Sequence, residues 1–288
     1  MPAPVSRRSA LALMASTAGT LSIEKAFAEA QVTAPTTLKG RIKQSICRGC
    51  YGFLALDILC EKVKPMGIVG IDLVGENEWE TVKRHGLVVS MGYGIGSLPD
   101  GWNTLANQDN LVKQSEDILA KAAKAGVPNV ITFSGNRRGL SDPQGMENCE
   151  KGLKRIVKVA EDLGVNVCME LLNSKRDHPD YQCDHTAWGV ELCKRVGSPR
   201  FKLLYDIYHM QIMEGDVCAT VTENIEYIAH FHTGGVPGRR DIDETQELNY
   251  TRVCQAIAGT KFKGYLAHEF GPKNKLESLA KAIRICDV

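Results

Sequence analysis

Short apolar runs alternate with longer amphipathic segments from residue 41 to the end of the chain, and this alternation constrains the fold most strongly. The short runs have the length and composition of buried strands, whereas the longer segments repeat apolar residues at helical spacing. Repeated strand–helix units form a parallel sheet covered by helices. Eight units over about 250 residues favour a closed barrel. We therefore predict an α/β chain with a single (β/α)8 barrel domain over residues 40–288.

The predicted strands are 41–47, 68–73, 87–91, 130–133, 165–170, 201–206, 228–232 and 264–269. The predicted helices are 55–63, 79–84, 103–125, 146–163, 186–196, 216–227, 250–258 and 276–285. A glycine-rich loop is expected at Gly92–Gly96, after the third strand. A dinucleotide site usually places its glycines after the first strand and an acidic residue later, so that class of site is disfavoured.

The last four predicted strands each finish in a carboxylate or an imidazole, at Glu170, Asp206, His232 and Glu269. Parallel strands present their C-terminal ends to one face, which carries the active site in barrel enzymes. Three carboxylates that converge there need a counter-charge, and a divalent cation is the simplest one. The donor set suits Mg²⁺, Mn²⁺, Co²⁺ or Zn²⁺. We therefore predict a metal-dependent enzyme.

Other polar residues lie close to these strand ends in the sequence. His209 follows the sixth strand, Arg239 ends a flexible turn after the seventh, and Asn173 follows the fifth. We predict that these three bind substrate, Arg239 by pairing with an anionic or polyhydroxy group. His209 could instead bind a second metal or cap a helix, Arg239 could be solvated, and Asn173 could shape its loop. His230 and His268 are expected to pack between sheet and helices.

The first 28 residues resemble a twin-arginine signal peptide. Arg7-Arg8 precedes an apolar run over 10–21 and the small-x-small pattern Ala26-Phe27-Ala28. The run is too short to span a bilayer, so stable membrane insertion is not expected. An amphipathic helix with a chance Arg-Arg pair is the alternative. We expect an exported, periplasmic protein whose residues 29–39 form a linker before the barrel.

Composition narrows the class of partner. The net charge is +1, and basic residues do not cluster with aromatic ones, so nucleic acid is disfavoured and a small-molecule substrate is expected. The chain has ten cysteines, several of them inside apolar segments where they suit small buried positions. Cys47 and Cys50 form a C-x-x-C pair that either reflects chance or closes a disulfide. The sequence leaves a homo-oligomer open.

Four segments resemble the xylose isomerase-like barrel superfamily, which includes hydroxypyruvate isomerases and ketose 3-epimerases. The segments are Met169–Asn173, Tyr205–His209, His230–His232 and Ala267–Phe270. The resemblance covers residues 41–288 and implies a TIM barrel. It also implies that Glu170, Asp206, His232 and Glu269 are metal ligands and that the two glutamates double as acid and base.

Some positions depart from one or other branch of this superfamily. Hydroxypyruvate isomerases usually carry glutamine where this chain has His232, whereas epimerases carry histidine. Segments 236–239 and 247–250 nevertheless resemble hydroxypyruvate isomerases, and Arg176 stands where epimerases tend to place a glutamate. The substrate therefore stays open at the level of sequence.

The predicted activity is a metal-dependent intramolecular oxidoreduction of the aldose–ketose type, similar to that of hydroxypyruvate isomerase. Glu170 or Glu269 would remove a proton next to a carbonyl, and one of the two would return a proton to the adjacent carbon through an enediolate. The alternatives are a ketose 3-epimerase and a metal-dependent lyase or hydrolase acting on a keto-sugar or a cyclic hydroxy-keto acid. A sugar-binding barrel without activity is the non-enzymatic alternative.

Overall fold

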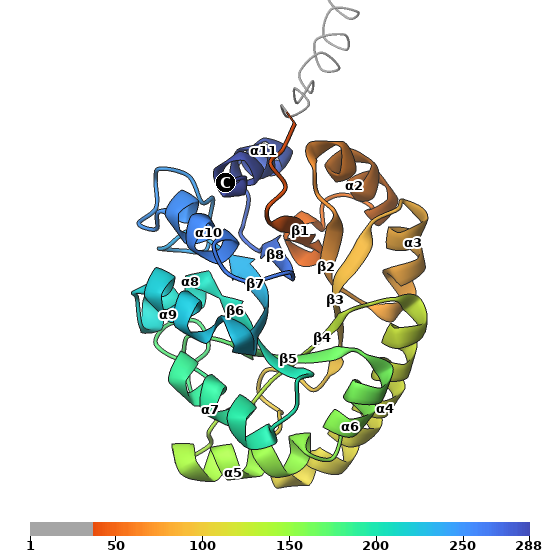
Figure 1. The fold of residues 1–288 in the computed structure, drawn as a ribbon, viewed down its shortest axis with the longest axis vertical. Coiled ribbons are helices and arrows are strands. Elements are labelled where there is room, and N and C mark those ends of the chain that lie inside the picture. Colours follow the sequence, from red (N-terminus) through yellow and green to blue (C-terminus); the bar gives the residue numbers. More distant parts are fainter. Residues whose placement is uncertain (1–36) are drawn as a thin grey trace, which may run out of the picture. The chain divides into compact units, whose positions relative to one another are not determined.

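The apolar runs form parallel strands that close into a barrel. A computed structural model of the chain describes residues 37–288, and within this range eight strands follow one another around the barrel in sequence order (Figure 1). They are β1 (Lys43–Cys47), β2 (Gly70–Val74), β3 (Val88–Ile95), β4 (Asn129–Thr132), β5 (Asn166–Leu171), β6 (Phe201–Asp206), β7 (Ile228–Thr233) and β8 (Tyr265–His268). The predicted (β/α)8 barrel is confirmed.

Helices form the outer layer and surround the strands (Figure 1). They are α2 (Leu56–Val63), α3 (Trp79–Arg84), α4 (Gln108–Ala125), α5 (Asp142–Leu153), α6 (Val157–Leu163), α7 (Thr186–Val196), α8 (Ile207–Met213), α9 (Val217–Asn224), α10 (Tyr250–Ala258) and α11 (Lys275–Cys286). Among the described residues, no helix has both the length and the apolar character needed to cross a membrane.

The strands are apolar along their length because both of their faces are covered. In β5, Val167, Cys168 and Met169 are all fully buried, although successive side chains point to opposite faces. One face packs against helices and the other fills the barrel, as expected for parallel strands. A carboxylate in such a strand is therefore placed where water cannot easily solvate it.

Glycines end the helices that precede two strands of the later site. Gly164 follows α6 and Gly197 follows α7, each in the left-handed conformation, with φ of 71° and 72°. This conformation is the usual way to end a helix and is accessible to glycine without a Cβ penalty. Both turns return the chain to the N-terminal end of the barrel, where β5 and β6 begin.

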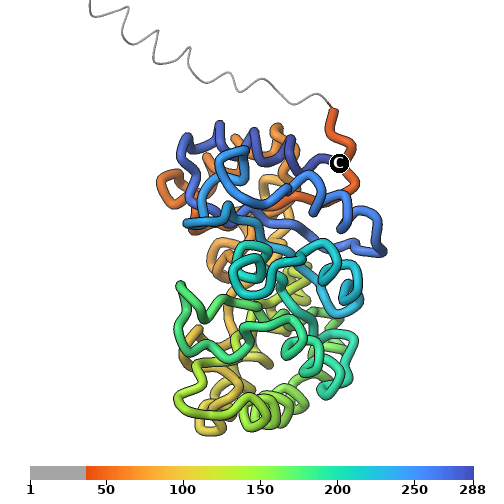
Figure 2. The backbone as a smooth tube through the Cα atoms, turned by 90° about the vertical axis from the view of Figure 1, so that its left-hand side faces the viewer, coloured from red at the N-terminus to blue at the C-terminus, as the bar shows by residue number. Residues whose placement is uncertain are grey.

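The two ends of the barrel domain meet. β1 pairs with β8 in parallel, from Lys43 opposite Tyr265 to Ile46 opposite His268. The Lys39 amide also donates to an Asp287 carboxylate oxygen at 2.9 Å. Figures 1 and 2 show the first strand beside the last elements of the chain. The barrel therefore has no open sheet edge between its first and last strands.

The segment predicted as a glycine-rich loop belongs largely to β3, which continues to Ile95. The prediction is wrong because glycine also occurs inside strands where a neighbouring side chain packs closely. At Gly92 the reason for glycine is close packing: a Cβ there would lie 2.9 Å from the Trp79 ring of α3. Glycine in a strand often marks such a close approach.

The predicted set of helices differs from the structure in three places. The single helix predicted over 146–163 is two helices, because Arg155 and Ile156 donate to carbonyls three residues back and break the α-helical bonding between α5 and α6. The helix predicted over 216–227 ends at Asn224, and a 3-10 turn follows. Helix α8 was not predicted. The predicted signal peptide and residues 29–36 of the linker lie outside the described residues.

The loop after β3 is held tightly against the loop after β4. An added Cβ on Gly101 would lie 2.3 Å from both the Gly135 nitrogen and the Phe133 carbonyl oxygen, which are backbone atoms. We expect Gly101→Ala to lower the free energy of unfolding by roughly 1–3 kcal/mol or more, because the backbone must move. Urea unfolding followed by circular dichroism measures this change.

The matched control is Gly49→Ala, at an exposed position where an added Cβ meets nothing within 4 Å. We expect it to change the free energy of unfolding by less than about 0.5 kcal/mol. Equal effects of the two substitutions would contradict the close approach at Gly101.

Candidate active site

The four residues predicted from the strand ends converge at the C-terminal mouth of the barrel. Glu170 lies in β5, Asp206 ends β6, His232 lies in β7 and Glu269 directly follows β8. One ligand atom from each lies within 4.8 Å of one from every other. Asp206 and His232 are fully buried, Glu170 is nearly so, and the Glu269 side chain is 17% exposed. The predicted cluster is therefore present in the structure.

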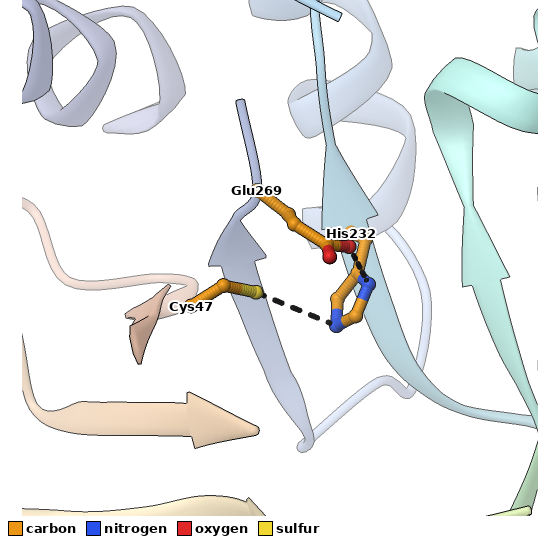
Figure 3. A group of neighbouring side chains, drawn as sticks. All are labelled: Cys47, His232 and Glu269. Carbon is orange, nitrogen blue, oxygen red and sulfur yellow. Dashed lines mark hydrogen bonds and ion pairs between the residues drawn. The ribbon is translucent and has the colours of Figure 1, made fainter. Parts of the chain in front are cut away.

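The imidazole of His232 is the centre of this cluster. Its Nδ1 atom lies 2.5 Å from Glu269 Oε2 and 3.3 Å from Glu170 Oε1, and 3.9 Å from Asp206 Oδ2 (Figure 3 shows the Glu269 pair). Nδ1 nevertheless meets the geometry of a hydrogen bond with none of the described residues. A buried nitrogen left in this way, with carboxylate oxygens around it, is suited to a metal ion.

Arg239 reaches the same carboxylates from the turn after β7. One of its guanidinium nitrogens lies 2.7 Å from Asp206 Oδ2 and 2.6 Å from Glu269 Oε2. Its guanidinium carbon lies 5.5 Å from the centre of the Tyr208 ring. Burial opposes the charge, but Asp206 and Glu269 hold the pKa of Arg239 above its ordinary value. Part of the counter-charge thus comes from the protein itself, whereas the sequence indicates a divalent cation as its simplest source.

Glu170 forms no ion pair with Arg239 among the described contacts. Burial raises the pKa of Glu170 to about 7, a shift that the nearby His232 opposes and the Glu269 charge reinforces. For His232, burial favours the neutral ring, but Glu269 and Cys47 outweigh it and raise its pKa. Three carboxylates and one imidazole thus share this site with a single guanidinium, and these oxygen-rich donors fit a hard or borderline divalent ion.

Cys47 lies on the other side of the His232 ring. Its Sγ atom is 3.9 Å from His232 Nε2, and Cys47, His232 and Glu269 form a group of metal-ligating residue types (Figure 3). Burial, with a further contribution from Glu269, raises the pKa of the Cys47 thiol well above its usual value. Because only a thiolate is a good ligand, Cys47 is a weaker candidate than the carboxylates. Within residues 37–288 every cysteine, including Cys50, is a free thiol.

His209 lies in the first turn of α8, and its ring is fully buried beside Asp206. Its Nε2 atom lies 3.6 Å from Asp206 Oδ2, and its Nδ1 atom lies 2.6 Å from Asn173 Nδ2. Burial, helped by the charge of Arg239, holds the pKa of His209 well below its ordinary value. A neutral imidazole with Nε2 unpaired among the described residues is thus present next to the carboxylate cluster.

Asn173 organises the loop after β5. Its Oδ1 accepts hydrogen bonds from the Arg176 and Asp177 amides, and its Nδ2 donates to Asp177 Oδ2. The same amide group contacts His209. These contacts show the loop-shaping role that the sequence left open, and the predicted contact with substrate stays a prediction.

The two remaining histidines have different environments. The prediction for His230 was wrong: it is two residues before His232, and such residues share one face of a strand. Its Nε2 atom lies 2.9 Å from Asp72 Oδ1 inside the barrel. The prediction for His268 is confirmed, because its ring contacts Gln44, whose side chain donates to the Ile283 carbonyl of α11.

Asp72 of β2 is the main residue that sequence reasoning missed. It is fully buried, and its Oδ2 atom lies 2.8 Å from His232 Nε2. The signal was available, because Asp72 is a lone carboxylate within the apolar run Ile71–Val74. Asp72 does not stand at the end of its predicted strand, so the strand-end pattern does not include it.

The family model described as xylose isomerase-like TIM barrel matches residues 71–286 of the chain. The chain therefore belongs to the xylose isomerase-like TIM barrel family.

Individual relatives match shorter parts of the chain. A 2-oxo-tetronate isomerase of Cupriavidus necator is 36% identical over 110 residues, which are 38% of this chain and 42% of that protein. A hydroxypyruvate isomerase of Escherichia coli is 31% identical over 102 residues, which are 35% of this chain and 39% of that protein. The chain thus spans about two fifths of the length of each of these curated relatives.

Solved structures support the same fold. A 3-keto-D-glucoside 4-epimerase of E. coli aligns with a TM-score of 0.71 and 22% identity, covering 85% of this chain and all of that one. A family 2 AP endonuclease of Brucella melitensis aligns with a TM-score of 0.75 and 21% identity, covering 82% of this chain and 96% of that one.

The ion pairs of Arg239 predict a stability effect in the absence of metal. Arg239→Met removes the guanidinium between Asp206 and Glu269 and leaves buried carboxylates without it. We expect the free energy of unfolding, measured by urea titration in EDTA, to fall by about 2–4 kcal/mol. This is somewhat below the cost of breaking a fully buried pair, because Arg239 is partly exposed to solvent.

Arg240→Met is the control, because Arg240 is the exposed neighbour and forms no ion pair among the described residues. We expect its effect to stay below about 0.5 kcal/mol. A loss as large as that of Arg239→Met would show that the site carboxylates are not what Arg239 stabilises.

Proposed function

We propose that this chain is a divalent-metal-dependent isomerase of small hydroxycarbonyl compounds, an intramolecular oxidoreductase of the aldose–ketose type similar to hydroxypyruvate isomerase. The observation that carries the proposal is the approach of two glutamates, Glu170 and Glu269, to one nitrogen of His232 at the barrel mouth. Relatives named hydroxypyruvate isomerase and 2-oxo-tetronate isomerase support this class of reaction.

The residues that would hold the metal are Glu170, Asp206, His232 and Glu269. Their oxygen-rich set with one imidazole suits Mg²⁺, Mn²⁺, Co²⁺ or Zn²⁺. When bound, such an ion polarises a carbonyl and makes the neighbouring C–H more acidic.

The two glutamates would carry the proton. One carboxylate, Glu170 or Glu269, takes the proton from the carbon next to the carbonyl, and the electron pair moves onto the carbonyl oxygen. The same or the other carboxyl group then returns a proton to the former carbonyl carbon, while the proton of the neighbouring hydroxyl passes to the former carbonyl oxygen, so that mass is conserved.

Substrate contacts would come from the groups around the carboxylate cluster. The guanidinium of Arg239 can stabilise negative charge that develops on the substrate oxygen. The unpaired Nε2 of His209 can hydrogen-bond a substrate hydroxyl, while Asn173 holds the His209 ring and can meet substrate at the loop. A small, oxygen-rich substrate fits these groups better than an apolar one.

A ketose 3-epimerase is the second candidate, and the imidazole of His232 favours it, because epimerases of this superfamily carry histidine there. A metal-dependent lyase or hydrolase acting on a keto-sugar or a cyclic hydroxy-keto acid could use the same donors. Product mass separates these candidates, since isomers and epimers keep the mass of the substrate whereas elimination and hydrolysis change it by one water.

We also propose that the protein is exported to the periplasm by a twin-arginine signal over residues 1–28, on the strength of Arg7-Arg8 and the apolar run that follows. Fractionation of cells that produce the full chain tests this. An Arg7→Lys/Arg8→Lys variant retained in the cytoplasm would support it, and an unchanged distribution would contradict it.

Glu170→Gln keeps the shape of the side chain but removes the proton-accepting oxygen. We expect turnover of the best substrate to fall about 10²–10⁴-fold, the usual contribution of a positioned acid or base. The measurement is kcat with a saturating divalent ion, together with metal content, because Glu170 is also a proposed ligand. Glu116→Gln, on the exposed face of α4, is the control and should keep full turnover.

Incubation with hydroxypyruvate and a panel of small ketoses in D2O tests the class of reaction. We expect the protein to contain about one divalent ion per chain and to place deuterium on the carbon next to the carbonyl. Metal without deuteration would favour the lyase or hydrolase candidate. A protein that takes up no divalent ion under replete conditions would overturn the proposed metal dependence.

A further inference from the structure

The His232 ring is held on both of its nitrogens. Nδ1 faces Glu170, Asp206 and Glu269, whereas Nε2 lies 2.8 Å from Asp72 Oδ2 on the opposite side. Asp72 comes from β2, which is far from β7 in the sequence but faces it across the barrel interior. Its carboxylate therefore contacts His232 from outside the group of Glu170, Asp206, His232 and Glu269, although Asp72, His230 and His232 also lie close enough to form a second group of metal-ligating residue types.

The orientation of the Asp72 carboxylate is fixed by its other contacts. Ser90 Oγ donates to Oδ1 at 2.7 Å, and His230 Nε2 lies 2.9 Å from the same oxygen. Cys47 Sγ lies 3.6 Å from Oδ2. Ser90 thus holds one oxygen by a hydrogen bond, with His230 close to it, while the other oxygen faces His232 and Cys47.

The Asp72 carboxylate is fully buried, and each of its oxygens has a polar partner: Ser90 at Oδ1 and His232 at Oδ2. A fully buried carboxylate is costly unless it is paired and hydrogen-bonded. A carboxylate at this buried position inside the barrel therefore points to a role other than filling the core.

We infer that Asp72 is a positioning residue that keeps a proton on Nε2 of His232 and so presents the Nδ1 lone pair to a metal ion at the carboxylate cluster. This inference rests on the proposed metal site. A carboxylate behind a metal-binding imidazole fixes its tautomer and ring orientation and raises its basicity. Removal of such a partner typically costs 10–100-fold in metal affinity.

The first experiment compares Mn²⁺ affinity in the wild type and in Asp72→Asn by calorimetric titration. The substitution keeps the shape of the side chain but replaces an ionised acceptor by a neutral amide. We expect the Kd for Mn²⁺ to rise 10–100-fold, with one Mn²⁺ bound per chain in both proteins.

Asp184→Asn is the matched control. Asp184 is also a buried aspartate, and it pairs with Arg137 and Ser174 in the loop region outside the carboxylate cluster. We expect this variant to be less stable to urea but to keep the Kd for Mn²⁺ within about threefold of the wild type. A general loss of packing would weaken both variants alike.

The second experiment reads the tautomer directly in the wild type, so it does not depend on the folding of a variant. In ¹⁵N-histidine-labelled protein with bound Zn²⁺, we expect the His232 signal to show a proton on Nε2 and none on Nδ1. Asp72→Asn, where it folds, should shift this signal towards the other tautomer.

Any one of three results would overturn this inference but leave the proposed metal site standing. They are an unchanged Kd in Asp72→Asn, an unprotonated Nε2 in the Zn²⁺-bound wild type, or two Mn²⁺ per chain of which Asp72→Asn loses one. The last result would make Asp72 a ligand rather than a positioning residue. A wild type that binds neither Mn²⁺ nor Zn²⁺ would overturn the proposed metal site and this inference together.

Discussion

Several buried carboxylates surround the His232 imidazole, and the need to balance their charge determines which groups can lie at the mouth of this barrel. Glu170, Asp206 and Glu269 meet on one side of the ring and Asp72 on the other, in a place where water cannot screen them. Carboxylates this close to one another repel when they are ionised, unless cationic groups lie between them. Arg239 supplies one such group, and the convergence of three carboxylates and one imidazole is the physical basis for proposing a divalent ion.

The barrel makes this concentration possible by fixing each residue on a separate rigid strand. Successive strands place Asp206 beside His232 in the β6–β7 register, and the glycine turns before β5 and β6 return the chain to the same starting level each time. Asp206 also caps α8 by accepting from the His209 amide, so one carboxylate ties a strand end, a helix start and the arginine together. A site on rigid elements with shared contacts keeps its geometry better than a site on loops.

The role of each polar residue near the site depends on contacts with residues that are distant in the sequence. Asn173 shapes its own loop and also holds the ring of His209, and Tyr208 lies under the guanidinium of Arg239. The same arrangement explains why His230 lies inside the barrel and His268 outside it, although both precede a site residue. The proposed isomerase chemistry needs this order, because proton transfer between adjacent carbons depends on carboxylates held at fixed positions.

The sequence by itself determined the barrel and the four strand-end residues. The spacing of apolar residues predicts strands and helices, and the residue at the C-terminal end of each strand can be read directly from the sequence. It could not show the break between α5 and α6, the extension of β3 through Gly92, or the helix that starts at Ile207, since these depend on packing. Only the tertiary structure decided that Arg239 pairs with Asp206 and Glu269 and that Asp72 stands behind His232. Those contacts join residues from strands and turns far apart in the chain, and closure of the barrel is the physical event that brings them together.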